Sequence, residues 1–150
     1  MRAVVQRVAS ASVVSDGELT GRIDRGLVVL LGVEVGDTRD DLEWLVRKVT
    51  GLRVFADEAG QMNRDLGEAG GRLLVVSQFT LLASTRKGKR PSYTRSARPG
   101  EAVPLYEAFC AACAKTTGQP VATGVFGADM QVELVNDGPV TVIIDSRLRE

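Results

Sequence analysis

Short stretches of alternating apolar and polar residues dominate the chain, with glycine, proline, asparagine or aspartate between them. This pattern is typical of strands joined by turns. It predicts strands over residues 2–8, 11–15, 18–23, 27–33, 52–56, 72–82, 120–126, 130–136 and 140–145. Apolar residues at helical spacing behind a Thr38 cap predict an amphipathic helix over residues 39–50, and an alanine-rich segment predicts a second helix over residues 102–116.

Many strands and two helices in mixed order favour an α+β fold over regularly alternating strands and helices. We expect mixed, largely antiparallel sheets that curl into a partial barrel with two main helices. The length of 150 residues fits a single domain, residues 1–150, that folds without disulfide or metal.

Hydropathy indicates no membrane segment. The longest apolar runs, such as residues 27–31, are far shorter than the roughly 20 residues that a membrane-spanning helix needs. The first residues, Met1 to Arg7, lack the apolar region of a signal peptide. We therefore expect a cytoplasmic protein with no membrane partner.

Histidine is absent from the chain, and several classes of enzyme need it. Without an imidazole, neither a Ser-His-Asp triad nor a Cys-His pair operates within one chain, and histidine-ligated metal hydrolysis is excluded as well. The phosphate-binding loop Gly-x-x-x-x-Gly-Lys-Ser/Thr and the dinucleotide fingerprint Gly-x-Gly-x-x-Gly are also absent. We expect no metal and no cofactor.

Cys110 and Cys113 form a Cys-x-x-Cys sequence inside the second predicted helix. Two thiols without histidine or further cysteine do not complete an ordinary zinc site, and a redox pair of this kind normally lies at a strand-to-helix turn. Buried structural thiols are the favoured interpretation.

Two polar strings interrupt the strand pattern. Ser77-Gln78-Phe79-Thr80-Leu81 follows a buried apolar strand, where a core strand would stay apolar. Asn136-Asp137-Gly138-Pro139-Val140-Thr141 lies between two predicted strands. This second string fits a hairpin, because Asp-Gly is a strong turn signal. It also fits a cis Gly-Pro bond, at a cost of about 0.5–1 kcal/mol, that turns two backbone carbonyls outward together.

Together the two strings resemble the signature pair of the D-aminoacyl-tRNA deacylases. Matches in the same order cover most of the chain, in the stretches 5–8, 11–13, 26–33, 52–55, 62–63, 90–92 and 123–130. The resemblance implies a curled sheet and a homodimer. It also implies hydrolysis of the ester bond of D-aminoacyl-tRNA, which releases the free D-amino acid and tRNA.

An aminoacyl ester is already activated, so positioned water and a stabilised oxyanion suffice for its hydrolysis. We expect backbone amides near Phe79 and Thr80 to stabilise the oxyanion, Gln78 to orient the ester or the water, and Ser77 to fix the pocket wall. Thr80 is the obvious nucleophile by residue type, but no histidine or nearby lysine activates it. Simple strand-end hydrogen bonding is the alternative interpretation of these polar side chains.

Discrimination between enantiomers is assigned by the resemblance to Gly138 and Pro139, which enter the pocket of the partner subunit. Their carbonyls would bind the substrate's α-amino group and leave no room for an L side chain. Arg7 either braces this motif or is a surface arginine on an edge strand. Phe126 and Met130 either line the pocket or belong to the core.

Charge is balanced overall but concentrated locally. Between Ser84 and Arg98 the chain carries six cations and no acidic residue: Arg86, Lys87, Lys89, Arg90, Arg95 and Arg98. Such a loop suits a polyanion, and Tyr93 within it is placed to stack on an unpaired base. A solvated loop without a specific partner is the alternative. With the resemblance, Arg86, Lys87, Lys89 and Arg90 become the expected contacts to the tRNA acceptor end.

Two other functions are compatible with these features. The first is a non-catalytic RNA-binding dimer that uses the 84–98 loop, and the second is a hydrolase of other activated esters. Action on glycyl-tRNA also stays open, because glycine has no side chain for a rigid backbone to exclude.

Overall fold

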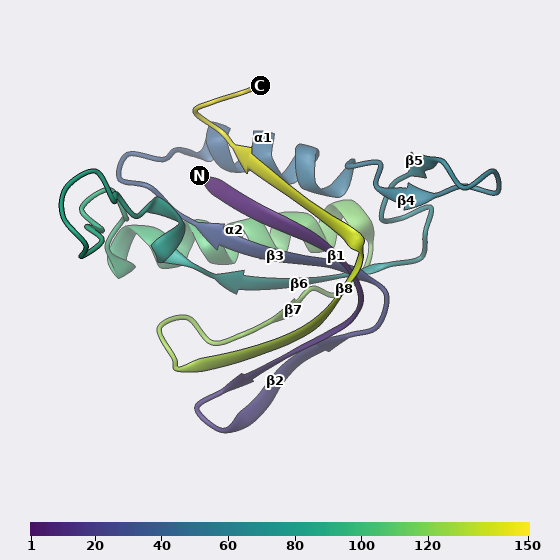
Figure 1. Cartoon of the computed structure of the whole chain (residues 1–150), viewed down its shortest axis with the longest axis horizontal. Coiled ribbons are helices and arrows are strands. Elements are labelled where there is room, and N and C mark those ends of the chain that lie inside the picture. The colour runs from purple at the N-terminus through teal and green to yellow at the C-terminus, as the bar shows by residue number, and fades with distance from the viewer.

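The computed structural model describes residues 1–150, as two α-helices against a strongly curled sheet (Figure 1). The elements follow in the order β1 (Arg2–Ser15), β2 (Glu18–Ile23), β3 (Gly26–Gly32), α1 (Arg39–Thr50), β4 (Phe55–Ala56), β5 (Met62–Arg64), β6 (Arg72–Ser77), the 3-10 turn η1 (Phe79–Leu82), α2 (Pro99–Thr117), β7 (Ala122–Thr123) and β8 (Met130–Asp145).

β1 and β8 are long, bent strands that pair antiparallel along most of their length. On its other edge, β1 pairs first with β3 and then with β2, also antiparallel. The sequence pattern predicted two strands in place of each long one, which was wrong. The register shifts between Gln6 and Ser10 explain the error, because a bulge breaks the alternation of side chains without ending the strand.

Beyond β3 the sheet continues through parallel pairs to β6 and β7. Its order is β2-β1-β3-β6-β7, with β8 paired to β1. β4 and β5 form a separate small hairpin that projects from one end of the molecule (Figure 1). The prediction of an α+β fold with a mixed, largely antiparallel sheet is confirmed.

Two cores lie on opposite faces of β3 and β6, because successive strand residues point to opposite sides. Leu27, Val29 and Val75 pack against both helices. Val28 and Leu74 belong to a second, smaller core inside the curl of the sheet. Burial on both faces explains why these two strands read as continuous apolar runs.

The sheet curls until β2 comes close to β7. A side chain cannot fit at Gly21 in β2, since a Cβ atom there would lie 2.7 Å from the carbonyl oxygen of Thr123 in β7. The close approach leaves one seam in an almost closed barrel. The predicted partial barrel is therefore confirmed.

Both helices were predicted, and α1 has the predicted bounds. Its start is fixed by a capping box in which Thr38 and Asp41 bond each other's backbone. α2 begins earlier than predicted, because Pro99 occupies a first-turn position, and it ends before Gly118 with φ 67°. Neither helix is long and apolar enough to cross a membrane.

Three predicted strands are shorter than expected. The 72–82 strand ends at Ser77, and its last part is η1, whose buried Leu82 anchors the turn. The 120–126 strand shrinks to β7, and the 52–56 strand shrinks to β4. Apolar residues in these segments are buried whether the backbone forms a strand or a turn. Hydropathy alone therefore does not show where a strand ends.

The two cysteines lie in α2 as free thiols, and Cys113 is fully buried. Burial raises the pKa of Cys110 to about 11 and that of Cys113 to about 12. Both thiols therefore stay protonated near neutral pH, as expected of structural thiols.

Candidate functional site

A pocket of about 300 Å³ lies where β6 ends and η1 begins. It gathers five of the residues singled out in the sequence: Ser77, Gln78, Phe79, Phe126 and Met130. The rest of its wall is mainly small or aliphatic, and comes from Leu31, Val33, Val76, Ala97, Ala102, Gly127, Ala128 and Val132. Polar groups at one side of an apolar pocket are typical of a small-molecule site.

The turn after β6 exposes two backbone donors. The amide of Gln78 still bonds the Leu31 carbonyl at 2.8 Å, which extends the parallel pairing with β3. The next two amides, of Phe79 and Thr80, open the 3-10 turn and find no acceptor in the chain. Adjacent free N–H groups in such a turn form a site for an anionic oxygen.

Thr80 does not line the pocket. Its hydroxyl instead accepts a hydrogen bond from the side-chain amide of Gln78. An amide cannot take up a proton, so Thr80 has no base beside it. The side chain of Ser77 stays on the pocket wall, as expected.

Phe126 and Met130 line the pocket and also pack against the two cores. The sequence left pocket wall and core as alternatives, and both describe these residues. Phe126 packs edge-on against Tyr106 of α2, with ring centroids 5.8 Å apart. Tyr106 is held in turn by donation of its hydroxyl to the Val75 carbonyl at 3.0 Å. Met130 packs on the core inside the curl.

The Gly138–Pro139 bond is cis and lies inside β8. The hairpin interpretation was therefore wrong: Asn136 pairs with Val8 and Thr141 pairs with Gln6, both in β1. The four residues 137–140 bulge out opposite one β1 residue, Arg7. Gly138 and Pro139 are both exposed.

Arg7 braces this bulge. Its Nε donates to the Asp137 carbonyl at 3.1 Å, and its Nη1 donates to the Val54 carbonyl at 2.6 Å. Its side chain is only 14% exposed, which rules out a surface arginine on an edge strand. The carbonyl that it holds belongs to the residue before Gly138, one position earlier than expected.

Within one chain the bulge and the pocket lie at opposite ends of the sheet. Arg7 pairs with Leu27, which pairs with Leu73 near the start of β6, whereas the pocket begins at Val76. Three residues of strand separate these levels by roughly 10 Å. Figure 1 shows the same separation, with the bend of β8 at one end and η1 at the other.

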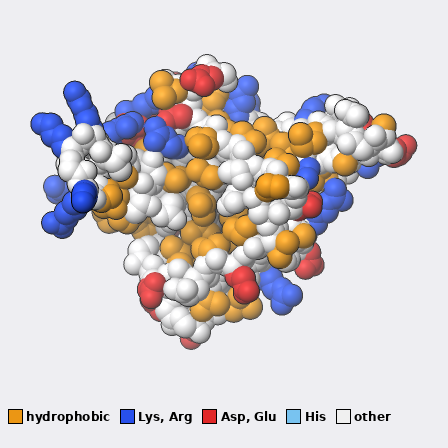
Figure 2. All heavy atoms as spheres, viewed as in Figure 1, with side chains coloured by type: hydrophobic (Ala, Val, Ile, Leu, Met, Phe, Trp, Pro, Cys, Tyr) orange, Lys and Arg blue, Asp and Glu red, His pale blue; other side chains and the backbone are white.

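The basic segment forms a hairpin closed by mutual backbone bonds of Ser84 and Ser92 at 2.8 and 2.9 Å. The four expected tRNA contacts are exposed at its tip and form no ion pair. Figure 2 shows a cluster of Lys and Arg side chains at the end of the molecule where this hairpin projects in Figure 1. Arg95 departs from the expectation, since its Nε donates to Glu34 at 2.9 Å.

Tyr93 lies at the base of this hairpin, next to the pocket. It packs edge-on against Phe79, with ring centroids 5.1 Å apart. Both rings remain substantially exposed, at 40% for Tyr93 and 55% for Phe79.

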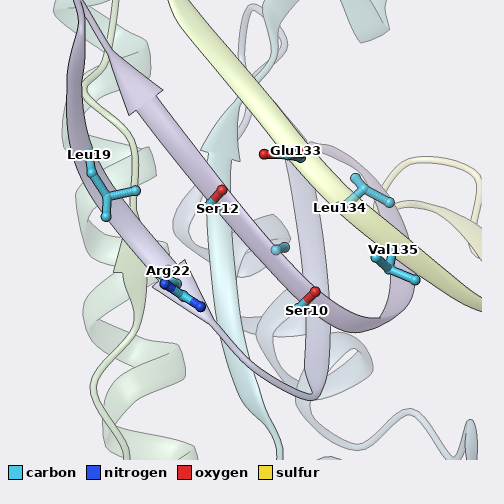
Figure 3. A pocket seen from close by; sticks show the side chains of 8 residues that line it. Ser10, Ser12, Leu19, Arg22, Glu133, Leu134 and Val135 are labelled. Carbon is cyan, nitrogen blue, oxygen red and sulfur yellow. The ribbon is translucent and has the colours of Figure 1, made fainter.

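A second pocket of about 300 Å³ lies between β1, β2 and β8 (Figure 3). Ser10, Ser12 and Arg22 line it together with Glu133. None of the candidate catalytic, substrate-binding or tRNA-binding residues lines it. No group of three or more His, Cys, Asp or Glu side chains is placed to hold a metal ion.

Sequence patterns missed one polar contact to the site. The Ser96 hydroxyl donates to the Phe79 carbonyl at 2.9 Å and so ties the 93–97 segment to η1. No motif surrounds this serine, and only the fold brings the two segments together.

The pocket, the unpaired amides beside it and the exposed cationic hairpin are features that a hydrolase of a nucleic-acid ester would need. A model of the D-Tyr-tRNA(Tyr) deacylase family matches residues 4–145. The chain therefore belongs to the D-aminoacyl-tRNA deacylase family.

Relatives agree with this placement. Proteins named D-aminoacyl-tRNA deacylase from Opitutus terrae and Parabacteroides distasonis are 61% and 57% identical, each over the full length of both chains. A solved structure named c-Myc DNA Unwinding Element Binding Protein is 41% identical, with a TM-score of 0.90 over 97% of this chain and 98% of that one. A probable eukaryotic D-amino acid tRNA deacylase shares the fold at 18% identity, with a TM-score of 0.84 over 96% of this chain and 98% of the other.

Proposed function

We propose that this protein hydrolyses the ester bond of D-aminoacyl-tRNA and rejects L-aminoacyl-tRNA. The observation that carries the proposal is the pocket at the end of β6, which is lined by Ser77, Gln78 and Phe79 and lies beside the unpaired amides of Phe79 and Thr80. A chain of this family that corrects charged tRNA acts in the cytoplasm, where tRNA is charged.

Hydrolysis then proceeds by direct attack of water. The amides of Phe79 and Thr80 stabilise the negative charge that develops on the ester oxygen, which lowers the barrier without a covalent intermediate. Gln78 orients the ester or the water. The 2′-hydroxyl of the terminal ribose supplies the proton transfer that this histidine-free pocket lacks.

Chirality is read by backbone atoms in this proposal. Gly138 and Pro139 lie outside the β1–β8 pairing and are exposed, so their carbonyls are available to a ligand. They bind the α-amino group of the substrate, and an L side chain would have to occupy their space. Glycyl-tRNA, with no side chain to exclude, is then also a substrate.

A homodimer follows from the same proposal. Because the bulge and the pocket are at opposite ends of one chain, the two meet only when the bulge of one subunit enters the pocket of the other. β8 also supports pairing of two copies: its outer edge is free, and Val135 and Ile143 on it are 58% and 70% exposed. Figure 2 shows apolar side chains along the middle of this face.

Purified protein mixed with matched D- and L-aminoacyl-tRNA tests the proposal. We expect release of the D-amino acid only. Equal release from both would show an unselective esterase, and release from neither would leave nucleic-acid binding.

Nucleic-acid binding without hydrolysis is the second candidate. It is supported by the exposed cations of the 84–92 hairpin and by the name of the 41% identical structure, c-Myc DNA Unwinding Element Binding Protein. The same experiment separates the two candidates, since a binding protein retains both substrates intact.

Thr80→Ala should leave most of the D-aminoacyl-tRNA hydrolysis intact. A nucleophile or general base contributes roughly 10²–10⁴-fold, whereas loss of the Gln78 contact should cost less than about tenfold in kcat. Single-turnover kinetics measure this effect. A covalent aminoacyl ester trapped on Thr80 during turnover would contradict it.

Truncating Phe126 or Met130 to alanine should slow hydrolysis of the D-substrate without admitting the L-substrate. The substitution loosens the pocket wall, and misplacement of this kind costs roughly tenfold or more, but the excluding carbonyls stay in place. Kinetics on both enantiomers provide the measurement, with Met62→Ala as a control because Met62 is exposed on β5. Equal rates on both enantiomers would show that side-chain fit reads chirality.

A further inference from the structure

Two buried carboxylates lie side by side just after β3. The side chain of Asp37 is fully buried and accepts hydrogen bonds from the Glu34 backbone amide at 2.6 Å and the Arg147 guanidinium at 3.1 Å, and it pairs with the Met1 ammonium group at 2.7 Å. The side chain of Glu34 is 9% exposed and pairs with Arg95 at 2.9 Å and with Arg147 at 3.5 Å. Buried charges persist only when paired, and the partners of Glu34 are these two arginines.

Arg95 links this cluster to the 93–97 segment. The Val35 amide donates to the Arg95 carbonyl at 2.9 Å, and the Ala97 amide donates to the Val33 carbonyl at 2.9 Å. The segment is therefore held on the end of β3 by two backbone bonds and one partly buried ion pair.

The same segment holds η1. The Ser96 hydroxyl donates to the Phe79 carbonyl at 2.9 Å, and Tyr93 packs against the Phe79 ring. The Phe79 carbonyl and the Thr80 N–H belong to one peptide plane, so these contacts set the direction of the Thr80 amide. The Phe79 N–H belongs to the preceding peptide, whose Gln78 carbonyl accepts the Leu81 amide at 3.2 Å within the turn.

We propose that Arg95 and Ser96 are positioning residues, which fix the direction of the Thr80 amide beside the pocket by tying η1 to the Glu34–Asp37 cluster. This inference rests on the proposed function. Arg95, which sequence alone groups with the tRNA-binding cations, acts on the chemical step through η1. The exposed cations of the hairpin act on binding.

The two roles predict opposite kinetic signatures. Loss of an anchor that only aims catalytic groups lowers kcat and leaves KM nearly unchanged, because the interaction counts only in the transition state. Misplacement by about 1 Å costs up to roughly a hundredfold. Loss of a phosphate contact raises KM and changes its salt dependence.

Kinetics of Arg95→Met and Ser96→Ala on D-aminoacyl-tRNA test the inference. We expect each to lower kcat at least about tenfold with KM within about twofold, and the double variant to be no worse than the poorer single one, since both remove the same anchor. Arg95→Lys, which keeps the charge, should recover part of the rate. Arg39→Met is the matched control, because it removes an exposed Arg39–Glu43 pair.

Amide exchange gives a readout that does not depend on activity. The Thr80 amide should exchange differently in Ser96→Ala than in the wild type, while the amides of α1 stay unchanged. Where Arg95→Met fails to fold, Ser96→Ala carries the test, since it removes a single hydroxyl. Variants with wild-type kcat, or with a raised KM alone, overturn the positioning role. A wild-type protein without D-aminoacyl-tRNA hydrolysis would overturn the proposed function instead.

Discussion

Gly138→Ala should abolish most of the D-aminoacyl-tRNA hydrolysis, with a loss of roughly a hundredfold or more in kcat/KM. Gly138 has φ 123°, a conformation that side chains rarely adopt. An added Cβ would lie 2.8 Å from the Arg7 guanidinium and 3.0 Å from the Val140 side chain. Either the Arg7 guanidinium moves, which disturbs its hydrogen bond to the Asp137 carbonyl, or the bulge itself shifts.

The matched control is Gly60→Ala. Gly60 also has a positive φ, 79°, but an added Cβ there meets nothing within 4 Å. Both variants place a side chain at a positive φ, which strains the backbone, and only Gly138→Ala also brings a Cβ against Arg7 and Val140. Steady-state kinetics on both enantiomers, with thermal melting of each variant, decide the matter. If Gly138→Ala were as active and selective as Gly60→Ala, the 137–140 bulge would have no part in hydrolysis or in the choice of enantiomer.

Local sequence predicted the parts of the fold that local physics determines. The helix α1 was predicted to the residue, because its cap and its apolar spacing both lie within residues 38–50. The division of β1 and β8 was mispredicted for the opposite reason. Whether a strand ends or bulges depends on the partner strand, and Arg7 opposite residues 137–140 is a contact over 130 positions.

The residues of the candidate site likewise fall into those that local sequence predicted and those that it did not. Ser77 and Gln78 were predicted because polar residues at the end of an apolar strand are a local anomaly. The other residues of the pocket wall, such as Ala97 and Val132, carry no such signal, because small and aliphatic residues are common throughout the chain. The role of Arg95 was equally hidden, because its partner Glu34 lies 61 positions away.

Charge reversal of the hairpin tip is the second prediction with a large expected effect. Replacing Arg86, Lys87, Lys89 and Arg90 with glutamate should weaken binding of tRNA roughly a hundredfold or more at moderate salt. These four side chains are exposed and form no ion pair, so they are free to neutralise phosphates. Each phosphate contact that is lost also removes about 0.7–0.9 from the slope of log K against log salt concentration.

The control variant has the same net charge as the hairpin variant, but its four reversed cations lie outside the hairpin. Arg22, Arg25, Arg47 and Lys115 are exposed, lie outside the hairpin and form no ion pair. Replacing these four with glutamate produces the same overall charge, so general repulsion of the polyanion is matched. Binding is measured over a range of salt concentrations, and we expect a shallower slope for the hairpin variant alone. The two variants differ only in the position of the four reversed charges. Equal slopes would therefore mean that the hairpin is a solvated loop without a specific contact to phosphate.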